Sequence, residues 1–427
     1  MRALIDLLRR RPAFRALWLG NLTSELGDWM GWVAVSVYAL GEGEGIVPLA
    51  LAYAAHNLPV ALVSPIAGVF ADRLDRRALM IGAAAAEGVL TLIMMAVVLA
   101  DALAWLPLVL LLRSGLAGVF VPAERAVLPR VVEREELLLA NTIQSTTWSV
   151  IFSVGMALGG LLAALGPALA LGLDALTFFV SVLLFWRLPS VRPEAPLDPA
   201  QRGARAPWAA IGAVAAELRE AWRWQLPRPE VSRALFAKTA LALAGATSWV
   251  LLYRVLWAAA PSIEAAAVIV GVMHGVRGVG TGVGPTLGTW LVRRGFDRMP
   301  LWHLAIFGAL LGMTPLFLPL EHPAPLWVIG AGNLLWGIGG GTTWVFSSVT
   351  IQSESPDRLL GRLNAVDFFL FLVVQSGSAV VAALLIEGGM YHGAVGAGAA
   401  ALGGLVWVGI NLRARRLRRR EATAPGA

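Results

Sequence analysis

Long apolar stretches recur along the whole chain and are separated by short polar or turn-forming segments. A helix that crosses a bilayer needs roughly 20 consecutive, predominantly apolar residues. On that criterion the pattern predicts twelve spans, at 15–40, 47–70, 78–100, 102–123, 141–165, 167–187, 234–258, 263–291, 300–320, 324–348, 361–386 and 393–412. The sequence therefore predicts an all-α polytopic membrane protein with twelve transmembrane helices in two six-helix halves.

The composition supports a membrane location. Hydrophobic residues make up 58% of the 427 residues and charged residues only 14%, and the mean hydropathy is +0.71. A soluble chain is nearer half apolar and a quarter charged, and one soluble core could not hide this much apolar surface. The chain has no cysteine, which excludes disulfides, thiol catalysis and cysteine-ligated metal. No cofactor and no metal site are expected.

The charges between the spans predict how the chain is oriented. Outside the spans, the arginines fall at the N-terminus, in the loops after even-numbered spans and in the tail, whereas the loops after odd-numbered spans carry acids such as Glu42 and Asp101. Basic loops stay on the cytoplasmic side, so both termini are expected in the cytoplasm. The net charge of +7 is then explained by orientation, and no nucleic-acid partner is expected. The basic run Arg413–Arg420 is expected to anchor the tail at anionic lipid.

The spans and loops predict four regions. An N-terminal six-helix half covers 1–187, and a linker covers 188–233. A C-terminal six-helix half covers 234–412, and a basic cytoplasmic tail covers 413–427. Within the linker, Trp208–Trp224 alternates apolar and charged positions with a helical period, which predicts an amphipathic helix at the inner membrane surface.

Three charged residues are predicted near the middle of spans, where an isolated charge costs about 2.5–3.5 kcal/mol. Glu25 and Asp28 are three residues apart, which puts them on one face of a helix, roughly one turn apart. Arg113 lies near the middle of the fourth span. Three roles are open: a carboxyl that takes up and releases protons, a static ion network, or a site for a cationic substrate. Lys238, near the start of span 7, is expected to extend to the inner surface.

The loop after the second span resembles the major facilitator signature G-x-x-x-D-[RK]-x-G-[RK]-[RK]. The residues that match are Gly68, Asp72, Arg73, Arg76 and Arg77. Asp75 stands where the general pattern has Gly. The resemblance implies the major facilitator fold, in which the charges of this loop latch the cytoplasmic ends of the two halves in one conformation. The expected partners of this latch are Glu124 and Asp367.

Further stretches resemble one branch of that superfamily, which holds macrolide-efflux and enterobactin-exporter-like proteins. They are Phe14–Asn21, Leu26–Trp29, Pro122–Pro129, Glu136–Asn141, Gly159–Leu161 and Asp174–Phe178. Asp28 and Asp174 both fall in these stretches, and a structural hydrogen-bonding role is favoured for Asp174. Arg277, in a glycine-rich part of span 8, is expected to face the transport cavity.

The resemblance and the intramembrane charges together predict a secondary active transporter. The favoured hypothesis is proton-coupled efflux of amphipathic or hydrophobic small molecules, drug-like or siderophore-like, by alternating access. The alternative is a lysophospholipid or lipid translocator, or an uncoupled facilitator, on the same fold. An intramembrane enzyme is a remote third, because no nucleophile–base or metal pattern is present. The expected partners are substrate, protons and membrane lipids, and the resemblance implies a monomer in a prokaryotic inner membrane.

Overall fold

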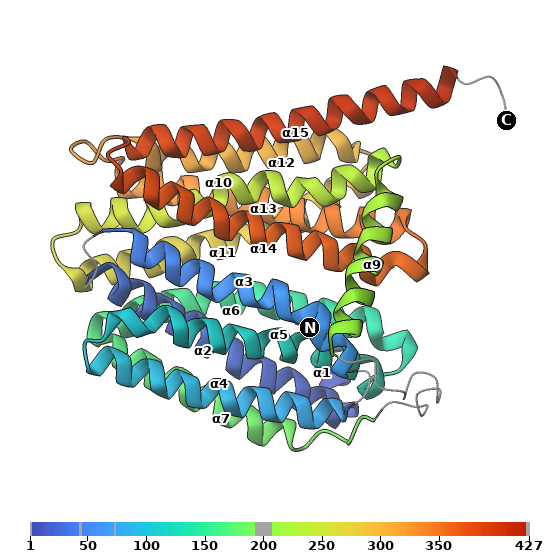
Figure 1. The fold of residues 1–427 in the computed structure, drawn as a ribbon, viewed down its shortest axis with the longest axis horizontal. Coiled ribbons are helices and arrows are strands. Elements are labelled where there is room, and N and C mark those ends of the chain that lie inside the picture. The colour runs from blue at the N-terminus through green and yellow to red at the C-terminus, as the bar shows by residue number, and fades with distance from the viewer. Residues whose placement is uncertain (1, 42–44, 72–73, 193–206, 424–427) are drawn as a thin grey trace. The chain divides into compact units, whose positions relative to one another are not determined.

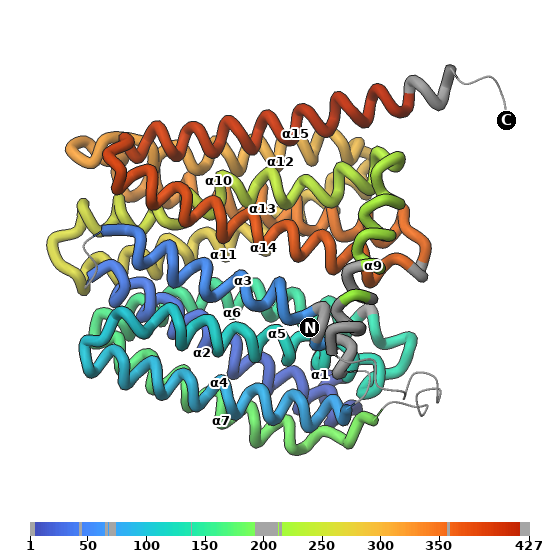
Figure 2. The backbone as a smooth tube through the Cα atoms, in the orientation of Figure 1, coloured from blue at the N-terminus to red at the C-terminus, as the bar shows by residue number. Residues whose placement is uncertain are grey.

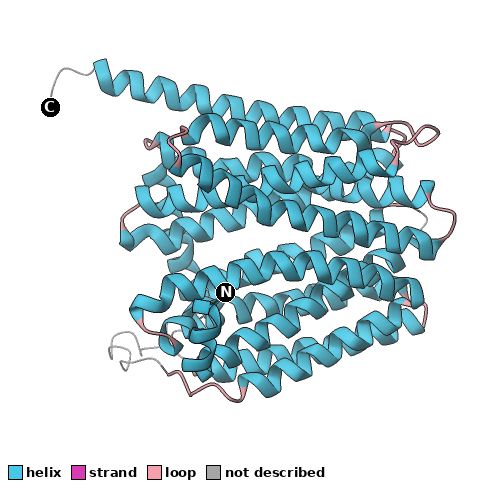
Figure 3. Ribbon diagram, turned by 180° about the vertical axis from the view of Figure 1, so that it is seen from behind, coloured by secondary structure: helices cyan, strands magenta, loops and turns pink. Residues whose placement is uncertain are grey.

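The computed structural model describes residues 2–41, 45–71, 74–192 and 207–423, and these residues form helices joined by short connections, with no strand among them (Figure 1, Figure 3). The first group of helices is α1 Arg2–Arg10, α2 Pro12–Gly41, α3 Val47–Ala71, α4 Arg76–Leu99, α5 Leu106–Val131, α6 Leu137–Leu165 and α7 Pro167–Phe185. The second is α9 Pro207–Gln225, α10 Pro229–Ala259, α11 Ile263–Arg293, α12 Arg298–Met313, α13 Leu326–Glu354, α14 Asp357–Glu387 and α15 His392–Thr423. Each of the twelve predicted spans corresponds to one of these helices.

Ten helices in the described part of the chain are long and apolar enough to cross a membrane. The two predicted spans outside that set are α2 and α13, of 30 and 29 residues. At 1.5 Å per residue both are about 45 Å long, which exceeds the roughly 30 Å of a bilayer core. They are less apolar because α2 carries polar and acidic residues, Glu25 and Asp28 among them, while α13 is rich in Gly, Ser and Thr. Such polar positions in a span usually face a cavity or a partner.

Proline lies at two of the helix boundaries that differ from the prediction. The prediction ended a span at 123, but α5 continues to Val131 through Pro122 and Pro129. Membrane helices tolerate proline because neighbouring helices satisfy the freed backbone groups. The prediction carried a span to 320, but α12 ends at Met313 and a 3-10 turn with Pro315 at its start follows.

The chain forms two compact units. The first comprises Met1–Ile211 and Ala260–Gly275, and the second Gly212–Ala259 and Val276–Ala427. In the first unit α2 packs against α6 and α7, and α4 packs against α5 and α7. In the second unit α10 packs against α13, α14 and α15, and α12 packs against α13. The domain limits expected from the sequence stay a prediction.

Three helix pairings of the first unit recur in the second. The pairs α2–α7, α2–α6 and α4–α5 correspond to α10–α15, α10–α14 and α12–α13 when the first six spans are matched in order with the last six. This recurrence is the structural counterpart of an internal repeat, which many transporters contain. α10 is the central helix of its unit. Of the residues in its 18-residue apolar stretch, 83% are buried.

Glycines on α6 let its neighbours approach at backbone distance. A Cβ at Gly159 would lie 2.8 Å from Met30 Cα on α2, and one at Gly160 would lie 2.6 Å from the Ala267 carbonyl oxygen on α11. A larger residue would force these helices apart, as is usual for small-residue interfaces in membranes. The turn between α6 and α7 lies at Gly166, whose φ of 145° is open to glycine alone in practice.

The linker contains a helix where one was expected, α9, which runs across the ends of helices of the second unit instead of alongside them (Figure 1). Its place at the inner membrane surface stays a prediction. Arg362 at the start of α14 binds Glu217 at 3.3 Å and Glu220 at 2.6 Å, both on α9. Trp222 of α9 meets Phe236 near the start of α10, with ring centroids 5.8 Å apart. α9 is therefore fastened to the second unit by an ion pair and an aromatic contact.

Both ends of the chain carry helix that the sequence did not predict. α1 precedes the first span, and Arg11 after it binds Glu133 and Glu136 in the α5–α6 connection. At the other end, α15 continues through the basic run as one unbroken helix (Figure 2). Arg418 of that extension pairs with Glu230 at the start of α10.

Candidate functional site

Arg113, in the first third of α5, binds carboxylates from two other helices. Its Nη2 donates to Asp28 Oδ1 on α2 and to Asp174 Oδ2 on α7, the latter at 3.4 Å. Its Nε donates to Thr91 Oγ1 on α4 at 3.0 Å, and its guanidinium lies 5.0 Å from the centroid of the Phe178 ring. One arginine therefore joins α2, α4 and α7 to α5. We call Asp28, Arg113 and Asp174 the charge triad.

Two glycines of α2 make room for Asp174. A Cβ at Gly31 would overlap Asp174 Oδ2, and one at Gly27 would lie 2.6 Å from Asp174 Oδ1. Only residues without a side chain let α2 pass this close to α7 while the carboxylate is in place. The part of α2 that contains Asp28 thus also contains the glycines that make room for Asp174, the second carboxylate bound by Arg113.

The two carboxylates of the triad differ in their exposure to the interior space. The side chains of Arg113 and Asp174 are 6% and 1% exposed, whereas that of Asp28 is 35% exposed. An ion pair out of contact with water is strongly coupled, because removal of either partner leaves the other charge uncompensated. Asp174 is therefore the fixed member of the triad, and Asp28 is the member that meets the cavity.

A cavity with a volume of about 120 Å³ adjoins the triad within the first unit. Its walls come from α2, α4, α5 and α7. The lining residues are Asn21, Ser24, Glu25, Asp28, Ala84, Glu87, Ala117, Phe120, Val121, Glu124 and Phe178. A cavity of roughly 150 Å³ holds a benzene molecule, so this space is somewhat smaller than a site for one ring.

Four of the lining residues are acids, and they differ in their partners. Asp28 binds Arg113. Glu124 Oε1 accepts hydrogen bonds from Asn21 Nδ2 and Gln144 Nε2, each at 2.9 Å. Glu25 and Glu87 accept no hydrogen bond and form no ion pair through their carboxyl groups within the described residues. The cavity thus has more acids than cations.

Arg277, expected at the cavity, belongs to the second unit. Its guanidinium carbon lies 4.1 Å from the ring centroid of Trp249 and 4.4 Å from that of Trp336. A guanidinium between two indole faces is stabilised by attraction to the ring quadrupoles. The glycine-rich part of α11 is closely packed, since a Cβ at Gly280 would overlap the backbone of α13. That Arg277 faces a transport cavity stays a prediction.

The prediction that Lys238 extends to the inner surface is wrong. Lys238 is 4% exposed, and its Nζ donates to Asp367 Oδ2 at 2.5 Å and to Ser348 Oγ at 3.2 Å. The ammonium also lies 4.2 Å from the ring centroid of Trp344. Asp367, expected as a latch partner, therefore has a buried partner within its own unit.

The described part of the α3–α4 loop binds other segments of the first unit. Arg76 Nη1 donates to the Ala126 carbonyl at 3.3 Å, and Arg77 Nη2 donates to the Trp186 carbonyl at 2.5 Å. Gly68 lies in α3, whereas Asp72 and Arg73 fall outside the described residues. The latch stays a prediction. In this conformation Glu124 and Asp367 are engaged by the partners given above.

Asp75, the departure from the signature, caps the N-terminus of α4. Its φ is −63°, an extended conformation open to any residue, so the glycine of the general pattern is not needed here. Partial burial opposes its ionisation. Hydrogen bonds from Ser190, from the Val191 amide and from the Arg77 amide outweigh that effect and lower the pKa of Asp75 below its ordinary value.

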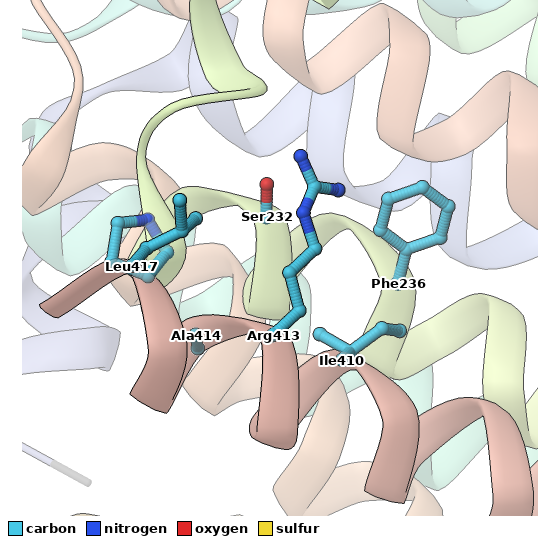
Figure 4. Close-up of a pocket in the computed structure, with 7 residues that line it drawn as sticks. Ser232, Phe236, Ile410, Arg413, Ala414 and Leu417 are labelled. Carbon is cyan, nitrogen blue, oxygen red and sulfur yellow. The ribbon is translucent and has the colours of Figure 1, made fainter. Parts of the chain in front are cut away.

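A second depression lies between the start of α10 and the end of the membrane part of α15 in the second unit. Figure 4 shows Ser232 and Phe236 facing Ile410 and Arg413 across it. Its volume is about 10 Å³, which is enough for about one water molecule. It is too small for a substrate.

The fold, with its long apolar helices and an acid-lined cavity in the first unit, is that expected of a polytopic α-helical membrane transporter. Among the described residues, no three His or carboxylate side chains are grouped as a metal site requires. A family model described as "Transmembrane secretion effector" matches residues 8–425. The chain belongs to that family of major facilitator transporters.

Curated relatives and solved structures agree with this assignment. The chain is 27% identical over 420 residues to the enterobactin exporter EntS of Escherichia coli O1:K1, with 96% of this chain and 92% of the relative covered. It is 26% identical over 417 residues to that of Shigella boydii serotype 4, at the same coverage. Among solved structures it resembles a POT family transporter in complex with 5-aminolevulinic acid (TM-score 0.73, 12% identity, 95% and 97% covered). It also resembles a bacterial homologue of the iron transporter ferroportin in an inward-facing state (TM-score 0.65, 19% identity, 93% and 98% covered).

The acids of the cavity differ in how clearly the sequence marks them. Glu25 and Asp28 stand out because they share one helix face, whereas the sequence pattern assigned no role to Glu87. The signal for Glu87 was its central position in the third span, where the cost of an isolated charge favours a cavity or a partner. The roles of Thr91 and Gly31 had no sequence signal, since both depend on which helix faces meet.

Proposed function

We propose that this protein is a proton-driven exporter of small amphipathic compounds across a prokaryotic inner membrane. The observation that carries the proposal is the acid-rich cavity around the charge triad. Such a cavity provides carboxyl groups that can change protonation when the space opens to one side or the other. The two compact units and the repeated pairings support alternating access, in which one unit moves against the other.

The direction of transport is inferred from relatives. The curated relatives are described as enterobactin exporters, which favours export and a substrate of siderophore-like size and amphipathicity. The basic loops and the basic extension of α15 support an arrangement with both termini in the cytoplasm.

The latch is part of the proposal. Arg76 and Arg77 bind backbone carbonyls in this conformation, and Glu124 is held by two amides. A cytoplasmic latch requires these groups to exchange partners during the transport cycle. An ion pair that forms in one state and breaks in the other biases the equilibrium between the two states.

The proposed function is tested by ligand stabilisation at two pH values. The purified protein is heated with a lipophilic cation, a macrolide, a catecholate siderophore or a lysophospholipid, at pH 6 and at pH 8. A ligand that binds the native state raises stability by RT ln(1 + [L]/Kd). If ligand and proton compete, a ligand that binds raises the stability of the protein more at pH 8 than at pH 6.

The variants Glu25→Gln and Asp28→Asn identify the source of that difference. Each is expected to reduce it, whereas the control Glu264→Gln, at an exposed position at the start of α11, is expected to keep it. Proton coupling would be contradicted by a ligand that raises the unfolding temperature equally at both pH values, in the wild-type protein and in both variants. If that ligand is the lysophospholipid, a lipid translocator becomes the better account.

A further inference from the structure

Glu87 lies in the middle of α4 and is one of the residues that line the acidic cavity. Its side chain is 5% exposed, and it lines the cavity beside Asp28 and Phe178. Its backbone carbonyl accepts a hydrogen bond from Thr91 Oγ1 at 2.9 Å. The carboxyl itself has no hydrogen bond or ion pair within the described structure. An unpaired carboxylate at a buried position is costly, so a carboxyl group without a partner is favoured there as the neutral acid.

The charged groups around Glu87 come from each helix that borders the cavity. They are Glu25 and Asp28 on α2, Arg113 and Glu124 on α5, and Asp174 on α7. Only one of them is a cation. Its described hydrogen bonds go from Nη2 to the two aspartates of the triad and from Nε to Thr91. Arg113 is therefore already bound to other groups, and Glu87 is an additional acid near this one positive charge.

Spacing along α4 links Glu87 to that cation. Thr91 is four residues after Glu87, so the two side chains lie on the same helix face, one turn apart. Thr91 holds Arg113 through Nε. A carboxylate at Glu87 would compete with Asp28 for the same guanidinium, because Asp28 is the more exposed member of the triad. Protonation of Glu87 removes that competition.

We propose that Glu87 carries the proton that is coupled to transport, an inference that rests on the proposed function. A proton from water in the cavity binds one carboxylate oxygen of Glu87 and yields the neutral acid, with Arg113 held by both aspartates. Loss of that proton to water restores the carboxylate, which draws Arg113 away from Asp28 and loosens α2 from α5. Proton occupancy thus selects between two arrangements of the helices that wall the cavity.

Infrared difference spectroscopy tests whether Glu87 binds a proton. The full chain in lipid vesicles is titrated across neutral pH, and the carbonyl stretch of a protonated carboxyl group is followed. Wild-type protein is expected to show this band, E87Q to lose it, and E87D to keep it with a shifted titration. E264Q, at an exposed position outside the cavity, serves as the control and is expected to retain the band. A band that persists unchanged in E87Q overturns the assignment.

Transport in the same vesicles tests the coupling. With the lipophilic cation tetraphenylphosphonium and the macrolide erythromycin as probes, a gradient of one pH unit supports at most about tenfold accumulation for each proton exchanged. E87Q is expected to lose the accumulation and still to exchange labelled for unlabelled probe, and E87D is expected to retain accumulation with a shifted pH profile. A wild-type protein that moves neither probe in response to the gradient refutes both the proposed function and the coupling role. A wild-type protein whose accumulation survives in E87Q refutes the Glu87 assignment alone.

Discussion

Replacement of Arg113 by Met removes the cation of the triad while it keeps most of the side-chain volume. Asp174, 1% exposed, is then left without its charge partner in the interior. Loss of one member of a buried ion pair costs about 3–5 kcal/mol. At about 2–4 °C for each kcal/mol in a unit of this size, the unfolding temperature should fall by roughly 6–20 °C.

Two further variants separate the charge effect from simple loss of packing. Asp28→Asn should cost only about 1 kcal/mol, because Asp28 is 35% exposed and Arg113 keeps Asp174. The double variant Arg113→Met with Asp174→Asn should recover about 1–3 kcal/mol of the loss, since the orphaned charge is gone.

The assay is thermal unfolding of the full chain in detergent, followed through the fluorescence of its 17 tryptophans at one fixed heating rate. Comparison at one rate is needed because membrane proteins unfold irreversibly and the midpoint depends on the rate. The reasoning is refuted if Arg113→Met is no less stable than Asp28→Asn. It is equally refuted if Asp174→Asn brings no recovery in the Arg113→Met background.

Three other predictions follow from packing and charge. Gly31→Ala should destabilise by about 1–3 kcal/mol, because its Cβ overlaps the carboxylate of α7; Gly115→Ala, with open space at its Cβ, is the matched control, and equal unfolding temperatures would contradict the packing argument. Asp75→Ala should cost about 1 kcal/mol through loss of the α4 cap, and Asp75→Asn should cost less. Because the pKa of Asp75 is lowered in the folded protein, the stability difference between Asp75 and its Asn variant should be full above about pH 4 and shrink as the pH falls below that; a pH-independent difference would contradict it. Lys238→Met should cost about 3–5 kcal/mol and be partly rescued by Asp367→Asn, and thermal unfolding without such rescue would show that the pair is not coupled.

The spans could be predicted because a bilayer imposes a length and an apolarity on each helix. That constraint does not locate helix ends, so the fourth span was predicted to end at 123, whereas α5 continues to Val131. The same limit explains the error at Lys238. α10 begins at Pro229, five residues before the predicted start at 234, which places Lys238 about two and a half turns into the helix.

The candidate site was predictable only in part, because intramembrane charge is visible in a sequence and helix rotation is not. The cost of charge in a membrane singled out Glu25, Asp28 and Arg113. The pairing of Arg113 with Asp174 depends on the close approach of α2 and α7 through Gly31, and no pattern in either segment specifies it. The role proposed for Glu87 likewise depends on how α4 packs against α5, which the sequence alone does not show.

The most direct test of the proposed function is reciprocal flux through wild-type protein in sealed vesicles. A panel of a lipophilic cation, a macrolide and a catecholate siderophore is measured with a pH-sensitive dye trapped inside. We expect that a pH gradient drives uptake of at least one compound. We also expect that a gradient of this compound, with no initial pH difference, drives protons in the opposite direction. If the compound crosses equally fast with and without the pH gradient and moves no protons, this protein is not a proton-driven exporter.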